Sequence, residues 1–126
     1  MPGRRLHVAL GVADLDASVE DYSWRLGHRP SVLVPGEYAL WRTGAVNFSI
    51  RKAENGARLR HLGWEDPEAR SFTQDTDVNG ITWERFTPAQ QLDEIEAAWP
   101  GASSLLTSKT PLQHARRRKP RRNRLS

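Results

Sequence analysis

The chain has 126 residues and no cysteine, so it is long enough for one domain with a core but lacks disulfide bonds and thiolate metal ligands. Its net charge of +4 is unevenly distributed, because residues 1–107 carry eleven basic and fifteen acidic side chains and the other eight basic residues follow them. No apolar run approaches the roughly 18–20 residues of a membrane span, and no signal peptide is recognisable. We therefore expect a cytoplasmic protein without a membrane segment.

The first half of the chain predicts a strand, a helix and then three strands. Alternating apolar residues predict a strand over 6–12, and Asp14 or Asp16 is expected to cap a helix that ends before Gly27. Three further apolar runs bounded by turn residues are predicted to be strands, the last two forming a hairpin, at 31–34, 38–43 and 45–51.

The second half of the chain begins to repeat this pattern and then departs from it. A strand is predicted near 59–65, and a helix from Pro67 to Thr76, because proline suits the first helical turn. A strand over 81–86 and an amphipathic helix over 88–99 follow. We expect this last helix to pack on the sheet in place of the missing hairpin.

Two histidines occupy equivalent places in the two halves. His7 opens the first apolar strand and precedes an acidic residue at a helix start, and His61 opens the strand of the second half in the same way. Equivalent residues of a duplicated unit can meet across a pseudo-twofold axis, and imidazoles are good ligands for divalent metals. The alternative for each histidine is an ordinary hydrogen-bonded side chain on a sheet face.

Several short motifs resemble the vicinal oxygen chelate superfamily, which includes glyoxalase I, bleomycin-resistance proteins, fosfomycin-resistance enzymes and extradiol dioxygenases. The resemblance covers roughly residues 5–86 and is carried by Leu6-His7-Val8-Ala9-Leu10, Asp14-Leu15-Asp16-Ala17-Ser18, Tyr22-Ser23, Tyr38-Ala39-Leu40-Trp41, Val46-Asn47-Phe48-Ser49-Ile50 and Arg60-His61-Leu62-Gly63. The later motifs are most similar to the branch of cadmium-induced proteins and organoarsenical lyases. That branch binds arsenic through vicinal cysteines, which this chain lacks, so we do not expect an arsenical substrate.

The resemblance implies an α+β fold in which paired βαβββ modules form an open, cupped mixed sheet. We predict one such domain over residues 1–101, with a first module at 5–52 and a truncated second module at 58–101 that ends in a helix. Residues 102–126 are predicted to be a disordered basic tail.

The resemblance also implies a metal site in which His7 and His61 are ligands. It places a glutamate ligand on the last strand of the second module, and the usual pattern of that strand is not visible in this sequence. Glu84 is our first choice for the third ligand and for the catalytic carboxylate, and Glu37 is the second. A partner subunit could also donate this ligand, and Glu84 could instead pair with a neighbouring arginine.

Two imidazoles and one carboxylate with open coordination positions suit zinc, iron, nickel or manganese, which would act as a Lewis acid. We therefore predict a metal-dependent glyoxalase-like or dioxygenase-like protein acting on a small oxygen-rich molecule, a lyase or an oxidoreductase if it is active. Two alternatives stay open. One is a metal-free protein that binds a small ligand in an aromatic groove, as sequestering resistance proteins do, and the other is a degenerate interaction domain.

The predicted cup has four candidate ligand contacts. Trp41 and Trp83 lie on strands expected to line it and could stack on a planar ligand, although most tryptophans of such a domain belong to its core. Asn47 and Ser49 share one face of a strand and could offer polar contacts inside the cup, or could face solvent.

Two expectations concern macromolecular partners. The shortened second module leaves sheet edge and apolar surface exposed, which favours a homodimer. The basic tail would bind nucleic acid only non-specifically, by counterion release, because no recognition fold precedes it.

Overall fold

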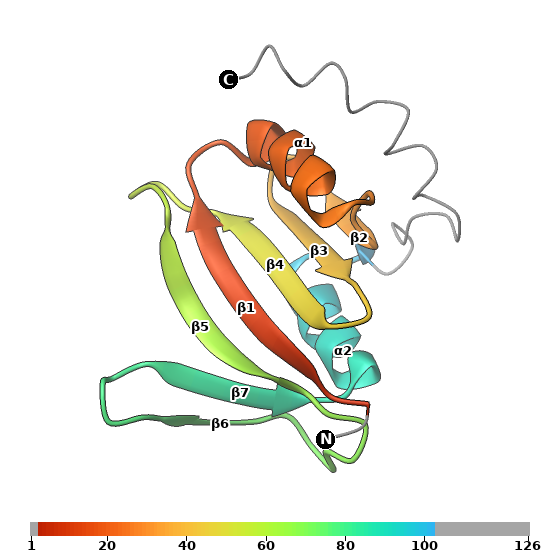
Figure 1. Cartoon of the computed structure of the whole chain (residues 1–126), viewed down its shortest axis with the longest axis vertical. Helices are drawn as coiled ribbons and strands as arrows, with labels where there is room; N and C mark the ends of the chain where they lie inside the picture. The colour runs from red at the N-terminus through yellow and green to blue at the C-terminus, as the bar shows by residue number, and fades with distance from the viewer. Residues whose placement is uncertain (1–2, 103–126) are drawn as a thin grey trace.

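Seven strands form one mixed sheet and two helices pack on it in the computed structural model, which describes residues 3–102 (Figure 1). The elements are β1 (Arg5–Val12), α1 (Leu15–Leu26), β2 (Val32–Val34), β3 (Tyr38–Arg42), β4 (Val46–Lys52), β5 (Arg58–Glu65), β6 (Thr73–Thr76), β7 (Thr82–Phe86) and α2 (Pro88–Ala98). The strands lie in the order β2-β3-β4-β1-β5-β7-β6. This is the predicted α+β architecture, one complete βαβββ module followed by a shortened one.

Helix α1 begins and ends where its sequence signals predict. Asp14 is the N-cap, and its carboxylate accepts a hydrogen bond of 3.0 Å from the backbone N–H of Ala17. Gly27 ends the helix with a φ of 88°, a left-handed conformation that glycine adopts at little cost, and its N–H bonds to the carbonyl of Ser23. Local capping therefore fixes the length of α1 independently of the sheet.

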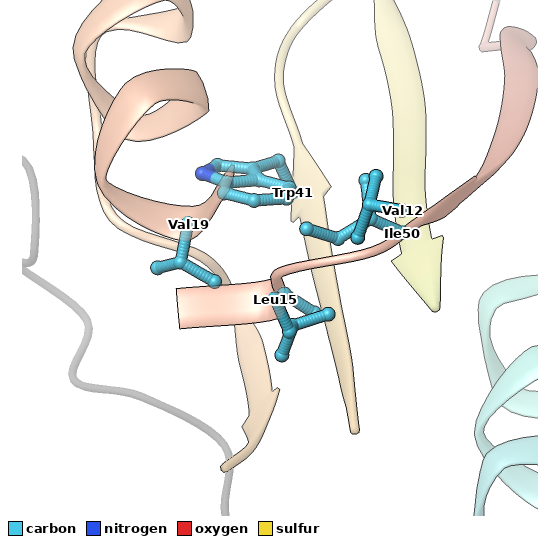
Figure 2. Close-up of a cluster of buried hydrophobic side chains, with 6 residues drawn as sticks. Val12, Leu15, Val19, Trp41 and Ile50 are labelled. Carbon is cyan, nitrogen blue, oxygen red and sulfur yellow. The ribbon is translucent and has the colours of Figure 1, made fainter. Parts of the chain in front are cut away.

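Alternate residues of β3 face two hydrophobic clusters on opposite faces of the sheet, as the pleat of a strand requires. Ala39 and Trp41 face α1, whereas Tyr38 and Leu40 face Ile95 of α2. The cluster beneath α1 consists of Val12, Leu15, Val19, Ala39, Trp41 and Ile50 (Figure 2). The two helices therefore cover opposite faces of the first module (Figure 1).

The two halves join along the antiparallel pair β1–β5 and repeat one pairing pattern. Strand β1 pairs in parallel with β4, which pairs antiparallel with β3, and β5 pairs in parallel with β7, which pairs antiparallel with β6. Strand β7 thus occupies in the second half the place that β4, the last strand of the module, occupies in the first. The counterparts of α1 and β2 are what the second half lacks.

The helix predicted from Pro67 to Thr76 is wrong. Its first part is held in a turn, in which Asp66 accepts a hydrogen bond from the backbone N–H of Glu68, and its second part is the strand β6. Two β-branched threonines favour the extended backbone of β6, and Gly80, with a φ of 80°, closes a hairpin to β7. The ladder between β6 and β7 outweighs the helix-starting preference of a single proline.

Helix α2 begins at the predicted residue, Pro88, but packs in a different place from the one predicted. Thr87 and Gln90 form a reciprocal capping box, in which each side chain accepts a hydrogen bond from the backbone N–H of the other residue. The helix then packs through Ile95 on β2 and β3 of the first module, not in place of a hairpin of the second. It consequently covers part of the concave side that the first module presents.

Two sequence-based expectations about the rest of the molecule stay predictions. The disordered basic tail was predicted to begin at residue 102, but Ala102 is buried in the cluster around Ile95, so that boundary is wrong by one residue. The rest of the predicted tail and its nucleic-acid binding fall on residues 103–126, outside the described part of the chain. The homodimer is untested, although β6 lies at the sheet edge with all four residues exposed. Among the described residues, no helix has the length and apolar character needed to cross a membrane.

Candidate metal centre

Three potential ligand atoms from three strands converge on the concave face of the sheet. The Nε2 atoms of His7 and His61 lie 3.0 Å apart, and Glu84 Oε1 lies 3.0 Å from His61 Nε2 and 3.9 Å from His7 Nε2. Atoms about 2.1 Å from a metal, at about 90–109° to one another, are separated by about 3.0–3.4 Å. The three side chains therefore lie close enough to hold one metal ion.

The register of β1 and β5 explains why the two imidazoles meet. His7 pairs with Gly63 and His61 pairs with Ala9, so the histidines lie symmetrically on either side of the pair Val8–Leu62. Residues two apart on a strand share a face, and both rings consequently project to the same side, with centroids 4.9 Å apart. The prediction that the two histidines meet is confirmed.

Glu84 comes from β7, the strand in the position of the last strand of a module. The resemblance implies a glutamate on the last strand of a module, but the sequence pointed to Glu84 only through its position in the second half and did not identify its strand as that last strand. Glu37, the second choice, is exposed in the turn before β3 and does not belong to the cluster. Arg85, beside Glu84 in the sequence, pairs instead with Asp66.

A glycine allows β7 to approach β5 closely enough for Glu84 to reach the histidines. Gly63 pairs directly with Glu84, and a Cβ added to Gly63 would overlap the backbone of Glu84, with its backbone carbon and nitrogen each only 3.0 Å away. Backbone atoms cannot move aside as the end of a flexible side chain can. Any larger residue at position 63 would therefore displace β7 and its carboxylate.

A buried carboxylate lies behind the histidine cluster and is held by two arginines. Glu65 is 1% exposed, and it accepts hydrogen bonds from Arg5 at 2.8 Å, from Arg42 at 2.8 Å through two nitrogens, and from Asn47 at 2.9 Å. Burial alone would raise the pKa of Glu65, but the hydrogen bonds from Arg42 and Asn47 outweigh it and lower the pKa to about 2. Glu65 is therefore an anion that only accepts hydrogen bonds.

This anion fixes the orientation of the Asn47 amide and, through it, the tautomer of His7. Asn47 Nδ2 faces Glu65, so Asn47 Oδ1 must be the atom that lies 2.8 Å from His7 Nδ1. An amide oxygen only accepts, and His7 Nδ1 consequently carries the proton. Gln91 of α2 closes the network, because it accepts from Asn47 Nδ2 at 2.8 Å and donates to Asn47 Oδ1 at 3.1 Å.

His7 therefore presents an unprotonated Nε2 to the cluster, the form that binds a metal. Burial lowers the pKa of His7, while the hydrogen bond to Asn47 acts in the opposite direction. The edge of the His7 ring also packs against Phe86, with centroids 4.9 Å apart. The ring is thus neutral and held in place on both sides before any ligand arrives.

A group of three electron donors at these separations needs a positive charge between them. The lone pairs of His7 Nε2, His61 Nε2 and Glu84 Oε1 repel one another unless a proton or a cation lies among them. A single proton on His61 Nε2 can satisfy one neighbour, whereas a divalent ion satisfies all three. The donor set therefore fits a metal of the zinc, iron, nickel or manganese class.

The cluster opens into a cavity of about 170 Å³ between the sheet and α2. Its lining residues combine aromatic rings with charges of both signs and are His7, Tyr38, Ser49, Arg51, Arg60, His61, Phe72, Glu84, Gln91, Glu94, Ile95, Ala98 and Trp99. Burial raises the pKa of Tyr38, so its hydroxyl keeps its proton over the physiological range. Burial, together with the nearby Arg51, lowers the pKa of Arg60.

The structure brings only some of the predicted ligand contacts to this cavity. Trp41 is fully buried beneath α1, and Trp83 lies on the opposite face of β7 from Glu84, where it donates a hydrogen bond to Asp77. The prediction that Trp41 and Trp83 line the cup is therefore wrong. Ser49 does line the cavity, and Asn47 lies behind it as the partner of His7.

The aromatic residues that do line the cavity were not identified from the sequence. Tyr38 precedes Trp41 by three positions on β3 and therefore faces the other side of the sheet, and it packs on Trp99 with centroids 4.7 Å apart. Trp99 follows the end of α2, whose position on the first module the sequence did not reveal. Strand alternation separates the two faces, but only the location of the two helices shows which face is which.

Comparisons with known proteins found no matching family model and no matching curated protein sequence. Among solved structures, the chain is similar to methylmalonyl-CoA epimerase from Mycobacterium tuberculosis, with 18% sequence identity and a TM-score of 0.42. The match covers 70% of this chain and 89% of that chain. A likeness at this level leaves the activity to be argued from the site itself.

Proposed function

We propose that His7, His61 and Glu84 bind one divalent metal ion, and that the protein acts on a small oxygen-rich molecule held at that ion. The observation that carries this proposal is the convergence of three donor atoms on the cavity, with His7 fixed in its metal-binding tautomer. The resemblance of the sequence to the vicinal oxygen chelate superfamily supports the same interpretation.

When bound there, such an ion would supply Lewis-acid activation of a carbonyl or of neighbouring oxygens in the ligand. The chain's own residues do the rest. The two histidines and Glu84 come from three neighbouring strands, so a large part of the coordination sphere is left open toward the cavity. Glu84 is 15% exposed in its side chain and is the carboxylate in reach of a proton on a carbon beside the held oxygens.

Metal binding by protein produced without a histidine tag tests the proposal. Metal-free protein is titrated calorimetrically with Zn²⁺, Mn²⁺, Ni²⁺ and, without oxygen, Fe²⁺. We expect a stoichiometry of one for at least one of these ions. His7→Ala, His61→Ala and Glu84→Gln should each weaken binding by more than the roughly 10–100-fold that loss of an outer hydrogen-bond partner costs.

His28→Ala is the matched control, because His28 lies outside the cluster and its ring donates a hydrogen bond to the carbonyl of Arg29. It should bind metal as the unaltered chain does. Wild-type protein that binds none of the four ions, or variants of His7 and His61 that keep stoichiometric metal, would overturn the proposal. Circular dichroism of each variant separates loss of the site from loss of the fold.

A metal-free ligand-binding protein is the second candidate, and the aromatic wall of the cavity favours it. The rings of Tyr38 and Trp99 pack against each other in a tilted arrangement, at an interplanar angle of 31°, and Arg51 lies over the Trp99 ring at 4.9 Å from its centroid. A protein of this kind would bind a planar ligand in the presence of a chelator. Quenching of tryptophan fluorescence that disappears in Trp99→Leu, with no dependence on metal, would favour this candidate over the first.

A further inference from the structure

Two arginines project into the cavity beside the candidate metal ligands. Arg51 lies on β4 and shares the concave face with Ser49, two residues earlier. Arg60 reaches the same cavity because β5 bulges there: Ala9 pairs with His61 and Leu10 with Leu59, which leaves Arg60 as the extra residue. A regular strand would send Arg60 and His61 to opposite faces, and the bulge lets both line one cavity.

Neither guanidinium has a partner carboxylate within residues 3–102. The other arginines that reach the sheet interior are paired, as Arg5 and Arg42 are with Glu65, but no salt bridge or side-chain hydrogen bond of Arg51 or Arg60 is formed in this part of the chain. In this part of the chain the guanidinium of Arg51 lies over the face of Trp99 and is half-buried, whereas Arg60 is exposed at the opening of the cavity. Two like charges thus lie close together at one small cavity, at an electrostatic cost.

The acidic residues of the cavity compensate this charge only in part, because Glu84 attracts Arg60 without forming a salt bridge with it in the described part of the chain. Glu84 belongs to the histidine cluster, where its carboxylate lies 3.0 Å from His61. Glu94 of α2 lines the cavity but is exposed and forms no salt bridge with either arginine in the described part of the chain. The hydroxyl of Tyr38, hydrogen-bonded to Ser49, adds a further polar group near both guanidinium groups.

We propose that Arg51 and Arg60 form an anion subsite, so that the ligand of this cavity carries a carboxylate or phosphate group in addition to the oxygens that face the histidine cluster. This inference rests on the proposed metal site for the position of the second set of oxygens. Guanidinium groups bind both anions through paired N–H donors. A cavity of about 170 Å³ accommodates a small organic acid or phosphorylated compound.

Two hydroxamates that differ by one phosphonate group test the subsite. Acetohydroxamate offers vicinal oxygens and no anionic group, whereas phosphonoacetohydroxamate offers the same oxygens and a phosphonate. Both are titrated calorimetrically into protein saturated with the metal that binds it best. We expect the phosphonate compound to bind at least about tenfold more tightly, the gain of one charge-assisted contact. Malonomonohydroxamic acid, with a carboxylate in place of the phosphonate, shows which anion is preferred.

The arginine variants show whether this preference comes from the subsite. In Arg51→Gln/Arg60→Gln the preference for the phosphonate compound should fall to within about twofold of unity, because no guanidinium remains to pair with it. Arg58→Gln, which alters an exposed arginine on β5 outside the cavity, should keep the full preference. Equal affinity for the two hydroxamates in wild-type protein, or a preference that survives the double substitution, would overturn the proposal.

Failure of the proposed metal site can be distinguished from failure of the anion subsite. If no metal binds, both hydroxamates lose their anchoring oxygens and the proposed function falls. Inorganic phosphate titrated into metal-free protein then decides on the subsite by itself. Binding that the double arginine variant abolishes and that Arg58→Gln retains supports the subsite, and absence of such binding overturns it.

Discussion

Asn47 Oδ1 lies 2.8 Å from His7 Nδ1 across the pair β1–β4, and this one contact decides which nitrogen of His7 faces the cavity. A residue that touches no ligand can therefore set the affinity of the site. We expect Asn47→Ala to lower metal affinity by roughly 10–100-fold, the usual effect of losing the partner of a ligating histidine. Competition with a chromogenic chelator measures this directly.

A merely structural role for Asn47 would show a different pattern. Gln91→Leu removes a partner of Asn47 from α2 but leaves the contact between Asn47 and His7 intact. It should lower the thermal midpoint more than it lowers metal affinity. If Asn47→Ala and Gln91→Leu reduce metal affinity equally, Asn47 does not act through the tautomer of His7.

Gly63→Ala should damage the site without touching a ligand. The added Cβ would overlap the backbone of Glu84 and separate β7 from β5, at a cost of about 1–3 kcal/mol in the free energy of unfolding. Metal affinity should fall at the same time, because Glu84 moves with its strand. Gly44→Ala is the control, since nothing lies within 4 Å of a Cβ placed there. Equal effects of the two substitutions would contradict the proposed close approach.

Glu65 should make the fold sensitive to acid. Its pKa is about 2 in the folded protein against an ordinary 4.5, so its contribution to stability is complete above about pH 4.5 and is lost as the pH falls toward 2. A shift of this size corresponds to about 3 kcal/mol. Urea unfolding between pH 6 and pH 2.5 measures the loss.

Substitution of the same residue isolates its share of this acid sensitivity. Glu65→Gln should unfold more easily at pH 6 and should lose much of the pH dependence below pH 4.5, because no buried carboxylate remains to be protonated. Glu20→Gln alters an exposed carboxylate paired with Arg29 and should retain the dependence. A Glu65→Gln variant as acid-sensitive as the wild type would show that other groups are responsible.

Trp41 should matter for stability and not for binding. Because its ring is fully buried beneath α1, Trp41→Ala should lower the free energy of unfolding by roughly 3–5 kcal/mol, and Trp41→Phe by less. Trp24→Ala, at a site 49% exposed, should change it little. The folded Trp41→Phe protein should bind acetohydroxamate with unchanged affinity. A large loss of affinity would show that Trp41 contributes to ligand binding after all.

The parts of the fold that were predictable from the sequence are those set by local signals. Alternation predicted β1 and β7, capping residues predicted α1, and amphipathic spacing predicted α2, because these patterns act over a few neighbouring residues. The second module was harder, since Pro67 suggests a helix locally and only the ladder with β7 makes β6 a strand. The faces assigned to Trp41 and Trp83 were wrong because alternation does not reveal which face a helix covers.

The candidate site likewise contains residues that could be predicted from the sequence and residues that could not. His7 and His61 were found because the two halves repeat, and Glu84 because it was the carboxylate nearest in position. The groups around them join residues far apart in the chain, such as Asn47 with Gln91 and Asn47 with Glu65. Periodic patterns in the sequence do not predict such long-range contacts. Arg60 was missed because a bulge reverses the face that simple alternation assigns to it.

Both hydrophobic clusters of residues 3–102 rest on the first module and α2, and neither contains a residue of β5, β6 or β7. Apart from Phe86, which is buried against Phe72 and His7, the second module depends on its ladder with β1 and on polar contacts. Its amides should therefore exchange with deuterium sooner than those of β3 and β4. His7 thus belongs to the more stable first module, whereas His61 and Glu84 belong to a module that opens more readily. A ligand that contacts both modules would stabilise the second one. It should slow amide hydrogen exchange in β5 and β7 and leave exchange in β3 unaffected.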